Sequence, residues 1–220
     1  MSKKAAIILS GCGYLDGAEI QESVLVTYFL QKRGIETEFF APDIDQHHVV
    51  NHLTGTPTGE RRNCLVEAAR IARGKIRPLT AYRAADFDCL VMPGGFGAAK
   101  NFADYAFKGV EGEVLPDLAR SITETHDAKK PILAICIAPV IVSIVLKESN
   151  PSVTIGDDAA TIADLIKIGA DHRVCAVEGF TVDTKNKIAT TPAYMYSADT
   201  LGVGRGIEAA VEGLAKMLGV

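Results

Sequence analysis

Short apolar runs alternate with helical patterns along the first three quarters of the chain. The runs predict strands at Ala5 to Ser10, Glu36 to Ala41, Cys89 to Met92 and Ile132 to Ile135. Runs this short, when they are apolar throughout, are typical of strands that are buried on both faces of a parallel sheet. Strands that alternate with helices form βαβ units. The pattern therefore predicts an α/β fold with a mostly parallel sheet between helices.

Apolar residues recur every three or four positions in the predicted helices, as they do in helices with one buried face. The first stripe joins Ile20, Val24 and Tyr28, and two further stripes lie in residues 114–122 and 207–218. We expect these helices to pack on the sheet.

The remaining segments predict smaller elements. Phe180 to Asp183 and Lys187 to Thr191 flank a polar turn, which predicts an antiparallel hairpin appended to the parallel core. Asn51 to Gly55 resembles a loop, Cys64 to Ala72 a helix, and Ile76 to Leu79 a short edge strand. No linker or internal repeat interrupts the chain, so we expect a single domain over residues 1–220.

Composition and charge restrict the classes of partner that this chain is expected to bind. The 220 residues are 48% hydrophobic and 23% charged, with a net charge of −4, which are ordinary values for a globular protein. An acidic chain without a basic stretch has no electrostatic reason to bind nucleic acid or an anionic membrane. No apolar segment reaches the length of a signal peptide core or a membrane span. We therefore expect a cytoplasmic protein without nucleic-acid or membrane partners.

The cysteines and histidines do not form a metal-binding pattern. Five cysteines, an odd number, are widely spaced and include no C-x-x-C pair, so reduced thiols are expected. His47, His48 and His52 lie close together, but no carboxylate or cysteine stands at a matching spacing. We expect no metal site.

Cys136 occupies the most informative position in the chain. It ends the apolar run at Ile132 to Ile135, and the Ile/Val/Leu-rich segment that follows predicts a helix with Pro139 in its first turn. The helix N-terminus offers unpaired backbone N–H groups and a partial positive charge, which favour a thiolate and stabilise an oxyanion. A cysteine is more often a buried core residue. The sequence leaves both interpretations open.

Two glycine-rich loops follow other predicted strands, at Ser10 to Gly13 and Pro93 to Gly97. The carboxyl ends of parallel strands share one edge of the sheet, so both loops and Cys136 should meet in one crevice. We expect the backbone N–H groups of Gly95 and Ile137 to serve as oxyanion donors beside the thiol.

Glu19, just after the first glycine loop, is the acid that we expect to pair with Cys136. Burial beside the thiol would raise its pKa and allow it to carry a proton at neutral pH. Asp16 and Glu19 also match a capping box, in which Glu19 has a purely structural role. Both roles remain open.

Gly11, Gly13 and Gly17 weakly match a dinucleotide-binding fingerprint. In that case NADH or NADPH would bind saturably and Cys136 would have no role. Asp16 and Glu19 would place negative charge near the pyrophosphate, so we expect no cofactor.

The motifs resemble the PfpI and Parkinsonism-associated deglycase superfamily, within the class I glutamine amidotransferase-like proteins. Leu90 to Asn101 and Ala134 to Pro139 carry this resemblance. Other stretches are similar to one branch, the ElbB-type isoprenoid biosynthesis glyoxalases: Ser10 to Gly13, Asp16 to Ile20, Asn51 to Gly55 and Thr190 to Met195.

The resemblance implies a flavodoxin-like three-layer sandwich and a homodimer, with Cys136 as nucleophile and Glu19 as its acidic partner. It also implies cofactor-independent conversion of methylglyoxal or glyoxal to a 2-hydroxy acid. Protease-like and amidotransferase members carry His or Gly after the nucleophile, whereas this chain has Ile137, which argues against peptidase and glutaminase chemistry. The residues expected around the oxyanion and the carbonyl substrate are Gly94, Gly95, Ile137, Gly11, Cys12 and His52.

A second hypothesis uses the same thiol without efficient turnover. Oxidation of a cysteine follows thiolate character and exposure, so Cys136 also fits a redox-responsive or regulatory binding protein.

Overall fold

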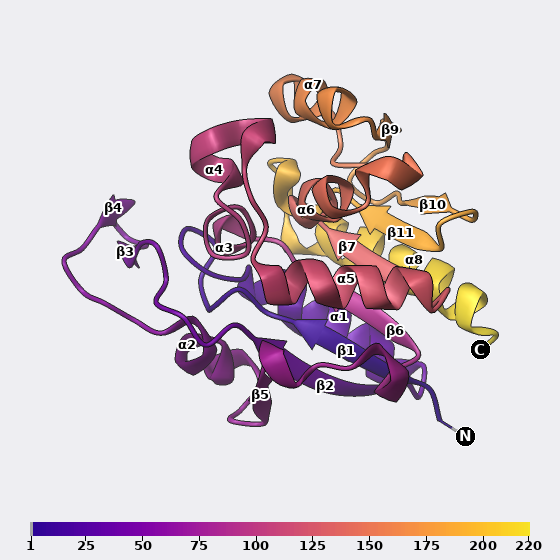
Figure 1. Cartoon of the computed structure of the whole chain (residues 1–220), viewed down its shortest axis with the longest axis horizontal. Helices are drawn as coiled ribbons and strands as arrows, with labels where there is room; N and C mark the ends of the chain where they lie inside the picture. The colour runs from indigo at the N-terminus through magenta and orange to yellow at the C-terminus, as the bar shows by residue number, and fades with distance from the viewer. Residues whose placement is uncertain (1) are drawn as a thin grey trace.

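A seven-stranded sheet runs through the centre of the computed structural model, which describes residues 2–220 (Figure 1). Its strand order is β10-β11-β7-β6-β1-β2-β5, and every neighbouring pair is parallel except β10 and β11. The strands are β1 (Lys4–Ile8), β2 (Glu36–Ala41), β5 (Ile76–Pro78), β6 (Cys89–Met92), β7 (Ile132–Ile135), β10 (Thr181–Asp183) and β11 (Ile188–Thr191). This sheet, with helices on both faces, confirms the predicted flavodoxin-like α/β sandwich.

Helices cover the sheet as two outer layers. The helices of residues 2–220 are α1 (Ile20–Lys32), α2 (Cys64–Ile71), α3 (Phe96–Lys100), α4 (Tyr105–Lys108), α5 (Pro116–Asp127), α6 (Ala138–Val145), α7 (Ala159–Ile168) and α8 (Thr200–Leu218). Of these, α4 packs on α3 and α7 packs on α6, outside the layers. Alternate residues of each buried strand face opposite layers. In β7, Leu133 packs with residues of α1 and α8, whereas Ala134 packs with residues of α5 and α6. Among residues 2–220, no helix is long and apolar enough to cross a membrane.

The predicted C-terminal hairpin is confirmed, and the structure shows how it joins the sheet. β11 pairs with β7 in parallel, so only the outer strand β10 is antiparallel. β5 is the opposite edge strand, as predicted, and ends at Pro78, one residue before the predicted end at Leu79. Two short two-stranded ladders lie outside the main sheet, formed by β3 (Val50–Asn51) with β4 (Thr56–Pro57) and by β8 (Ser152–Val153) with β9 (Asp171–His172).

Helix α1 buries a different face from the one that its apolar stripe predicts. Ile20, Val24 and Tyr28 are 45%, 53% and 58% exposed, whereas the buried positions include Glu22 and Val26. The sheet lies on one side of α1 and α8 packs against it as well. Packing against these elements therefore turns Glu22 inward and leaves the apolar stripe outside.

This orientation of α1 can be tested with the same substitution at two of its valines. Val26 is fully buried and Val24 is 53% exposed. Val26→Ala should lower the free energy of unfolding by about 2 kcal/mol, because it removes buried methyl groups and leaves a cavity. Val24→Ala should change it by less than about 0.5 kcal/mol. Urea denaturation of both variants measures the difference, and equal losses would contradict the orientation.

Candidate active site

Cys136 forms a sharp turn between strand β7 and helix α6. Its φ angle is +62°, a left-handed conformation that is uncommon outside glycine and typical of a strand–nucleophile–helix elbow. Its backbone N–H donates a hydrogen bond to the carbonyl of Thr191 on β11 at 2.9 Å, which holds the turn. Ile137 precedes α6 as its N-cap residue, and Pro139 lies in the first helical turn as predicted. The turn places the thiol at the N-terminus of α6.

The acid that contacts this thiol is Glu22. Its side chain hydrogen-bonds with the Cys136 thiol, and the backbone N–H of Gly94 donates to its Oε2 at 2.8 Å. A longer contact of 3.4 Å joins the backbone nitrogen of Tyr194 to its Oε1. Glu22 is fully buried on the inner face of α1. The structure therefore gives Glu22 the contact that the sequence analysis expects of Glu19.

Glu19 has a structural role one turn earlier. It is the N-cap of α1, and its Oε2 accepts a hydrogen bond from the backbone N–H of Glu22 at 2.6 Å. The predicted capping box is not formed, because Asp16 lies farther from the helix and its Oδ2 accepts from the Val50 N–H at 2.6 Å. Glu19 nevertheless lines the same cavity as Cys136.

Burial governs the protonation of the Cys136–Glu22 pair. Burial and the neighbouring charge of Glu19 raise the pKa of Glu22 to about 7, against the hydrogen bond from Gly94. Burial and the charge of Glu22 also raise the pKa of the Cys136 thiol well above its usual value. The backbone N–H groups of Gly95 and Ile137 act in the opposite direction. Burial therefore outweighs the effect of the helix N-terminus on the pKa of Cys136. At neutral pH the sulfur is a thiol, beside a carboxyl group that titrates near pH 7.

Glycine is required at the loop that faces the thiol. A Cβ atom on Gly94 would lie 2.5 Å from the Cβ of Cys136 and 3.0 Å from both its Sγ and the Oε2 of Glu22. Gly95 has a φ angle of +93°, and a Cβ there would lie 2.4 Å from the carbonyl oxygen of Gly17. The loop therefore approaches the thiol and the first glycine loop more closely than any larger residue allows.

A cavity of about 850 Å³ opens above the thiol. Its lining includes Cys136, Gly95 and Ile137, together with aromatic and acidic side chains. The aromatic residues are Tyr14, Phe96, Tyr105 and Tyr194, and the acidic ones are Glu19, Asp158 and Asp199. The cavity is therefore a concave, partly apolar space with a nucleophile, as expected of a small-molecule site.

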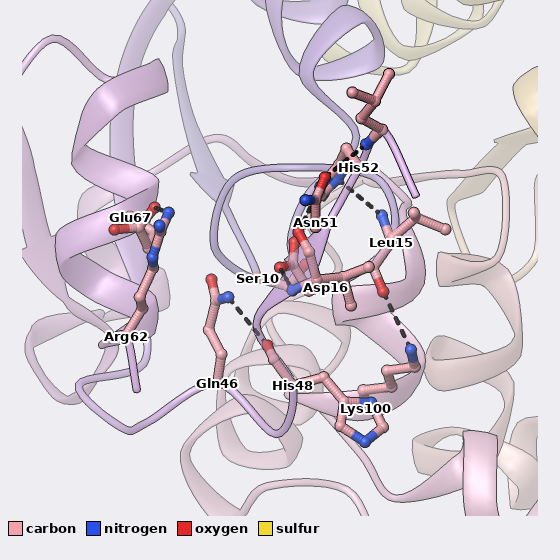
Figure 2. Close-up of polar contacts among 12 residues, drawn as sticks. Ser10, Leu15, Asp16, Gln46, His48, Asn51, His52, Arg62, Glu67 and Lys100 are labelled. Atoms are coloured by element: carbon pink, nitrogen blue, oxygen red, sulfur yellow. Dashed lines mark hydrogen bonds and ion pairs between the residues drawn. The ribbon is translucent and has the colours of Figure 1, made fainter. Parts of the chain in front are cut away.

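Gly11, Cys12 and His52 lie outside the cavity lining. Figure 2 shows His52 beside Leu15 and Asp16. The Nε2 atom of His52 accepts a hydrogen bond from the Leu15 N–H at 3.3 Å, and its ring meets Tyr14 edge to face at 5.3 Å. Tyr14 does line the cavity. His52 thus supports the cavity wall through Tyr14 and Leu15, and the structure does not bring it to the thiol.

Glu22 and Tyr194 are site residues that the sequence does not predict. Glu22 lies one helical turn before Val26 and two turns before Leu30, on the same face of α1. An acidic residue in line with an apolar stripe is a signal of a buried carboxyl group. Tyr194 belongs to the Thr190 to Met195 motif, but nothing in its local sequence indicates that its backbone nitrogen reaches Glu22. Among the residues described, no group of three or more Asp, Glu, His or Cys side chains is placed to hold a metal ion.

Comparison with solved structures supports this fold. An isoprenoid biosynthesis protein with an amidotransferase-like domain from Ehrlichia chaffeensis superimposes with a TM-score of 0.93 at 38% identity, over 99% of this chain and 100% of that one. Drosophila melanogaster DJ-1beta superimposes with a TM-score of 0.54 at 20% identity, over 100% and 99% of the two chains, which shows a shared fold alone. The fold, the cysteine elbow and the 38% identity to the Ehrlichia chaffeensis protein define a protein with an amidotransferase-like domain.

Curated relatives show the family to which the chain belongs. The rat "ES1 protein homolog, mitochondrial" and the human "Glutamine amidotransferase-like class 1 domain-containing protein 3, mitochondrial" are each 42% identical over 226 residues, which cover 98% of this chain and 84% of theirs. No family model matches the chain. The chain belongs to the family of these ES1 and glutamine amidotransferase-like class 1 domain proteins.

The relatives correct the expected cytoplasmic location. Both are named as mitochondrial proteins, which contradicts that expectation. The expectation rested on the absence of an apolar segment, which does not distinguish the cytosol from the interior of an organelle.

The raised pKa of Glu22 predicts a specific pH dependence of stability. An acid whose pKa is higher in the folded state than in the unfolded chain stabilises the fold fully below its unfolded pKa, and this contribution is lost as pH rises through about 7. The stability of the parent relative to Glu22→Gln should therefore fall by about 3 kcal/mol between pH 4 and pH 8. Urea denaturation at several pH values measures this. Glu148→Gln makes the same change at an exposed position and is the control; a constant difference between parent and Glu22→Gln would contradict the buried carboxyl group.

Proposed function

We propose that this protein is a cofactor-independent glyoxalase that converts methylglyoxal or glyoxal to a 2-hydroxy acid through Cys136. The observation that carries the proposal is a thiol, Cys136, that lines a cavity and contacts the buried Glu22 behind it, with the N–H groups of Gly95 and Ile137 directed at the sulfur. A thiol, an adjacent base and two backbone donors are the groups that addition to an aldehyde requires.

The reaction begins when Glu22 accepts the thiol proton and the sulfur adds to the aldehyde carbon of methylglyoxal. The N–H groups of Gly95 and Ile137 stabilise the oxyanion, which takes up a proton to give a hemithioacetal. The hydrogen on the former aldehyde carbon then leaves as a proton, and the neighbouring carbon gains one, through an enediol. The product is a lactoyl thioester on Cys136. Water hydrolyses it to lactate and restores the thiol, so the net reaction adds one water and needs no external oxidant or reductant.

A carboxyl group with a pKa of about 7 suits the proton transfers in this sequence. It is ionised in about half of the molecules at pH 7, and once protonated it is a strong enough acid to return the proton. Glu22 touches the sulfur, so the carbon atoms bonded to that sulfur lie within its reach. Glu19 stands farther out on the cavity wall, and the structure favours Glu22 as the proton carrier.

Peptidase and glutaminase chemistry have less support. Those reactions require protonation of an amine leaving group, commonly by a histidine next to the nucleophile. Among residues 2–220, no histidine lines the cavity, and Ile137 follows Cys136. The words "amidotransferase-like" in the relatives' names therefore describe their domain, and we do not propose that activity here.

The similarity to the Ehrlichia chaffeensis protein supports placing the chain in the ElbB-type branch, which we propose on the motifs as well. The homodimer and the independence from cofactors remain predictions. A redox-responsive role is less favoured, because Cys136 is only 7% exposed and its raised pKa keeps the thiolate fraction small at neutral pH.

Lactate formation from methylglyoxal, without glutathione or added metal, is the direct test. The parent protein should form lactate and Cys136→Ser should form none. Glu22→Gln should lower kcat at pH 7 by at least about 100-fold, because general acid–base catalysis contributes on that scale. Glu19→Gln should cause a smaller loss. A larger loss in Glu19→Gln would return the proton-carrying role to Glu19, and no lactate from the parent would reject the glyoxalase.

The pH profile separates catalysis by Glu22 from simple thiol ionisation. In the parent, kcat/KM should rise with pH and reach half its plateau near pH 7, as Glu22 loses its proton and becomes able to accept that of Cys136. In Glu22→Gln this step should disappear, and residual activity should rise only at alkaline pH, where the buried thiol itself ionises. The same midpoint in both proteins would exclude Glu22 as the base.

A further inference from the structure

The cavity above Cys136 carries negative charge at its wall and no basic side chain. Glu19, Asp158 and Asp199 line it, and within the described part of the chain no Lys, Arg or His does. Lys100 lies on the same short helix as Phe96, but its Nζ donates to the carbonyl of Leu15 at 3.1 Å and is not part of the lining. A ligand that enters the cavity therefore meets carboxylates without a compensating cation.

These three carboxylates are held in place because each one caps a helix. Glu19 caps α1, Asp158 accepts from the Thr161 N–H at 2.8 Å at the start of α7, and Asp199 accepts from the Gly202 N–H at 2.8 Å at the start of α8. Hydrogen bonds from Thr161 lower the pKa of Asp158, so it stays ionised at neutral pH. Helix N-termini offset about half a unit charge each, which leaves a net negative wall.

Helix α6 differs from α1, α7 and α8. No side-chain cap bonds its N-terminus, where Cys136 lies and where the Ile137 N–H is directed at the sulfur. The cavity therefore stabilises negative charge at the sulfur, where the reaction generates it. At α1, α7 and α8, in contrast, carboxylates already occupy the helix N-termini.

We propose that this cavity selects its carbonyl substrate by charge, with Glu19, Asp158 and Asp199 as specificity-determining residues. It favours carbonyl compounds with a cationic or neutral body over those with a carboxylate or phosphate. The volume of about 850 Å³ accommodates a body much larger than a three-carbon dicarbonyl, and four aromatic rings line it beside the carboxylates. Aromatic faces and carboxylates both attract cations, which makes an ammonium-bearing aldehyde the best match. This substrate class rests on the proposed function, but the charge selection does not require turnover.

The charge selection is testable with three thiol reagents that differ in charge. They are the neutral methyl methanethiosulfonate, its cationic trimethylammonium-ethyl analogue and its anionic sulfonatoethyl analogue. In each reaction the thiol loses its proton, the sulfur forms a disulfide bond with the reagent, and methanesulfinate leaves. Peptide-resolved mass spectrometry gives the rate at Cys136 alone, and division by the rate with 2-mercaptoethanol removes intrinsic reactivity.

At low ionic strength the normalised rate of the cationic reagent at Cys136 should exceed that of the anionic one by at least about tenfold. Added salt should reduce this ratio, because Asp158 and Asp199 are exposed and salt screens exposed charges. The triple variant Glu19→Gln, Asp158→Asn and Asp199→Asn should bring the ratio close to one. Amide side chains also cap helices, and circular dichroism checks that the fold is retained.

Two exposed carboxylates outside the cavity provide the control. Asp86→Asn with Glu148→Gln lowers the net negative charge without touching the lining, and should leave most of the ratio in place. A ratio near one in the parent, or an equal ratio in the parent and the triple variant, would overturn the charge selection. Lactate formation without charge selection would leave the glyoxalase proposal intact, and charge selection without lactate would reject only the glyoxalase.

Discussion

The buried carboxyl group of Glu22 is the group around which the site is organised. Removing a carboxylate from water is expensive unless hydrogen bonds replace the lost solvation, and the fold supplies one from the Gly94 N–H and a contact with the Cys136 thiol. Glu22 lies on α1, and these partners come from the β6–α3 loop and the β7–α6 elbow. The hydrogen bonds of the Glu22 carboxyl group therefore form only when all three segments are packed together.

The elbow at Cys136 supports this arrangement from the other side. A positive φ angle at a cysteine costs about 1–3 kcal/mol, and such strain persists only where surrounding contacts determine the conformation. The backbone bond from Cys136 to Thr191 and the close approach of Gly94 supply those contacts. In exchange, the sulfur lies at the start of α6 with two backbone N–H groups directed at it. The same backbone strain thus places the nucleophile and its oxyanion donors.

The sequence predicts the sheet well because its central strands are apolar at nearly every position. The elbow is predictable for the same reason, since Cys136 separates such a strand from a helix that contains Pro139 in its first turn. The acid is harder to predict. Periodicity assigns charged residues to solvent, and the exposed stripe of Ile20, Val24 and Tyr28 outweighs the stripe that contains Glu22. The cavity wall is harder still, because Asp158 and Asp199 lie more than a hundred residues from Glu19 and meet it only through tertiary packing.

The position of Cys136 between the two outer layers has a consequence for the motions of the whole molecule. Cys136 packs with the core under α1 and α8, while the next residue, Ile137, contacts both this core and the one under α5 and α6. Partial opening of either layer would therefore expose the same sulfur. The integrity of the elbow, and with it the position of the thiol, therefore depends on both halves of the sandwich staying packed on the sheet.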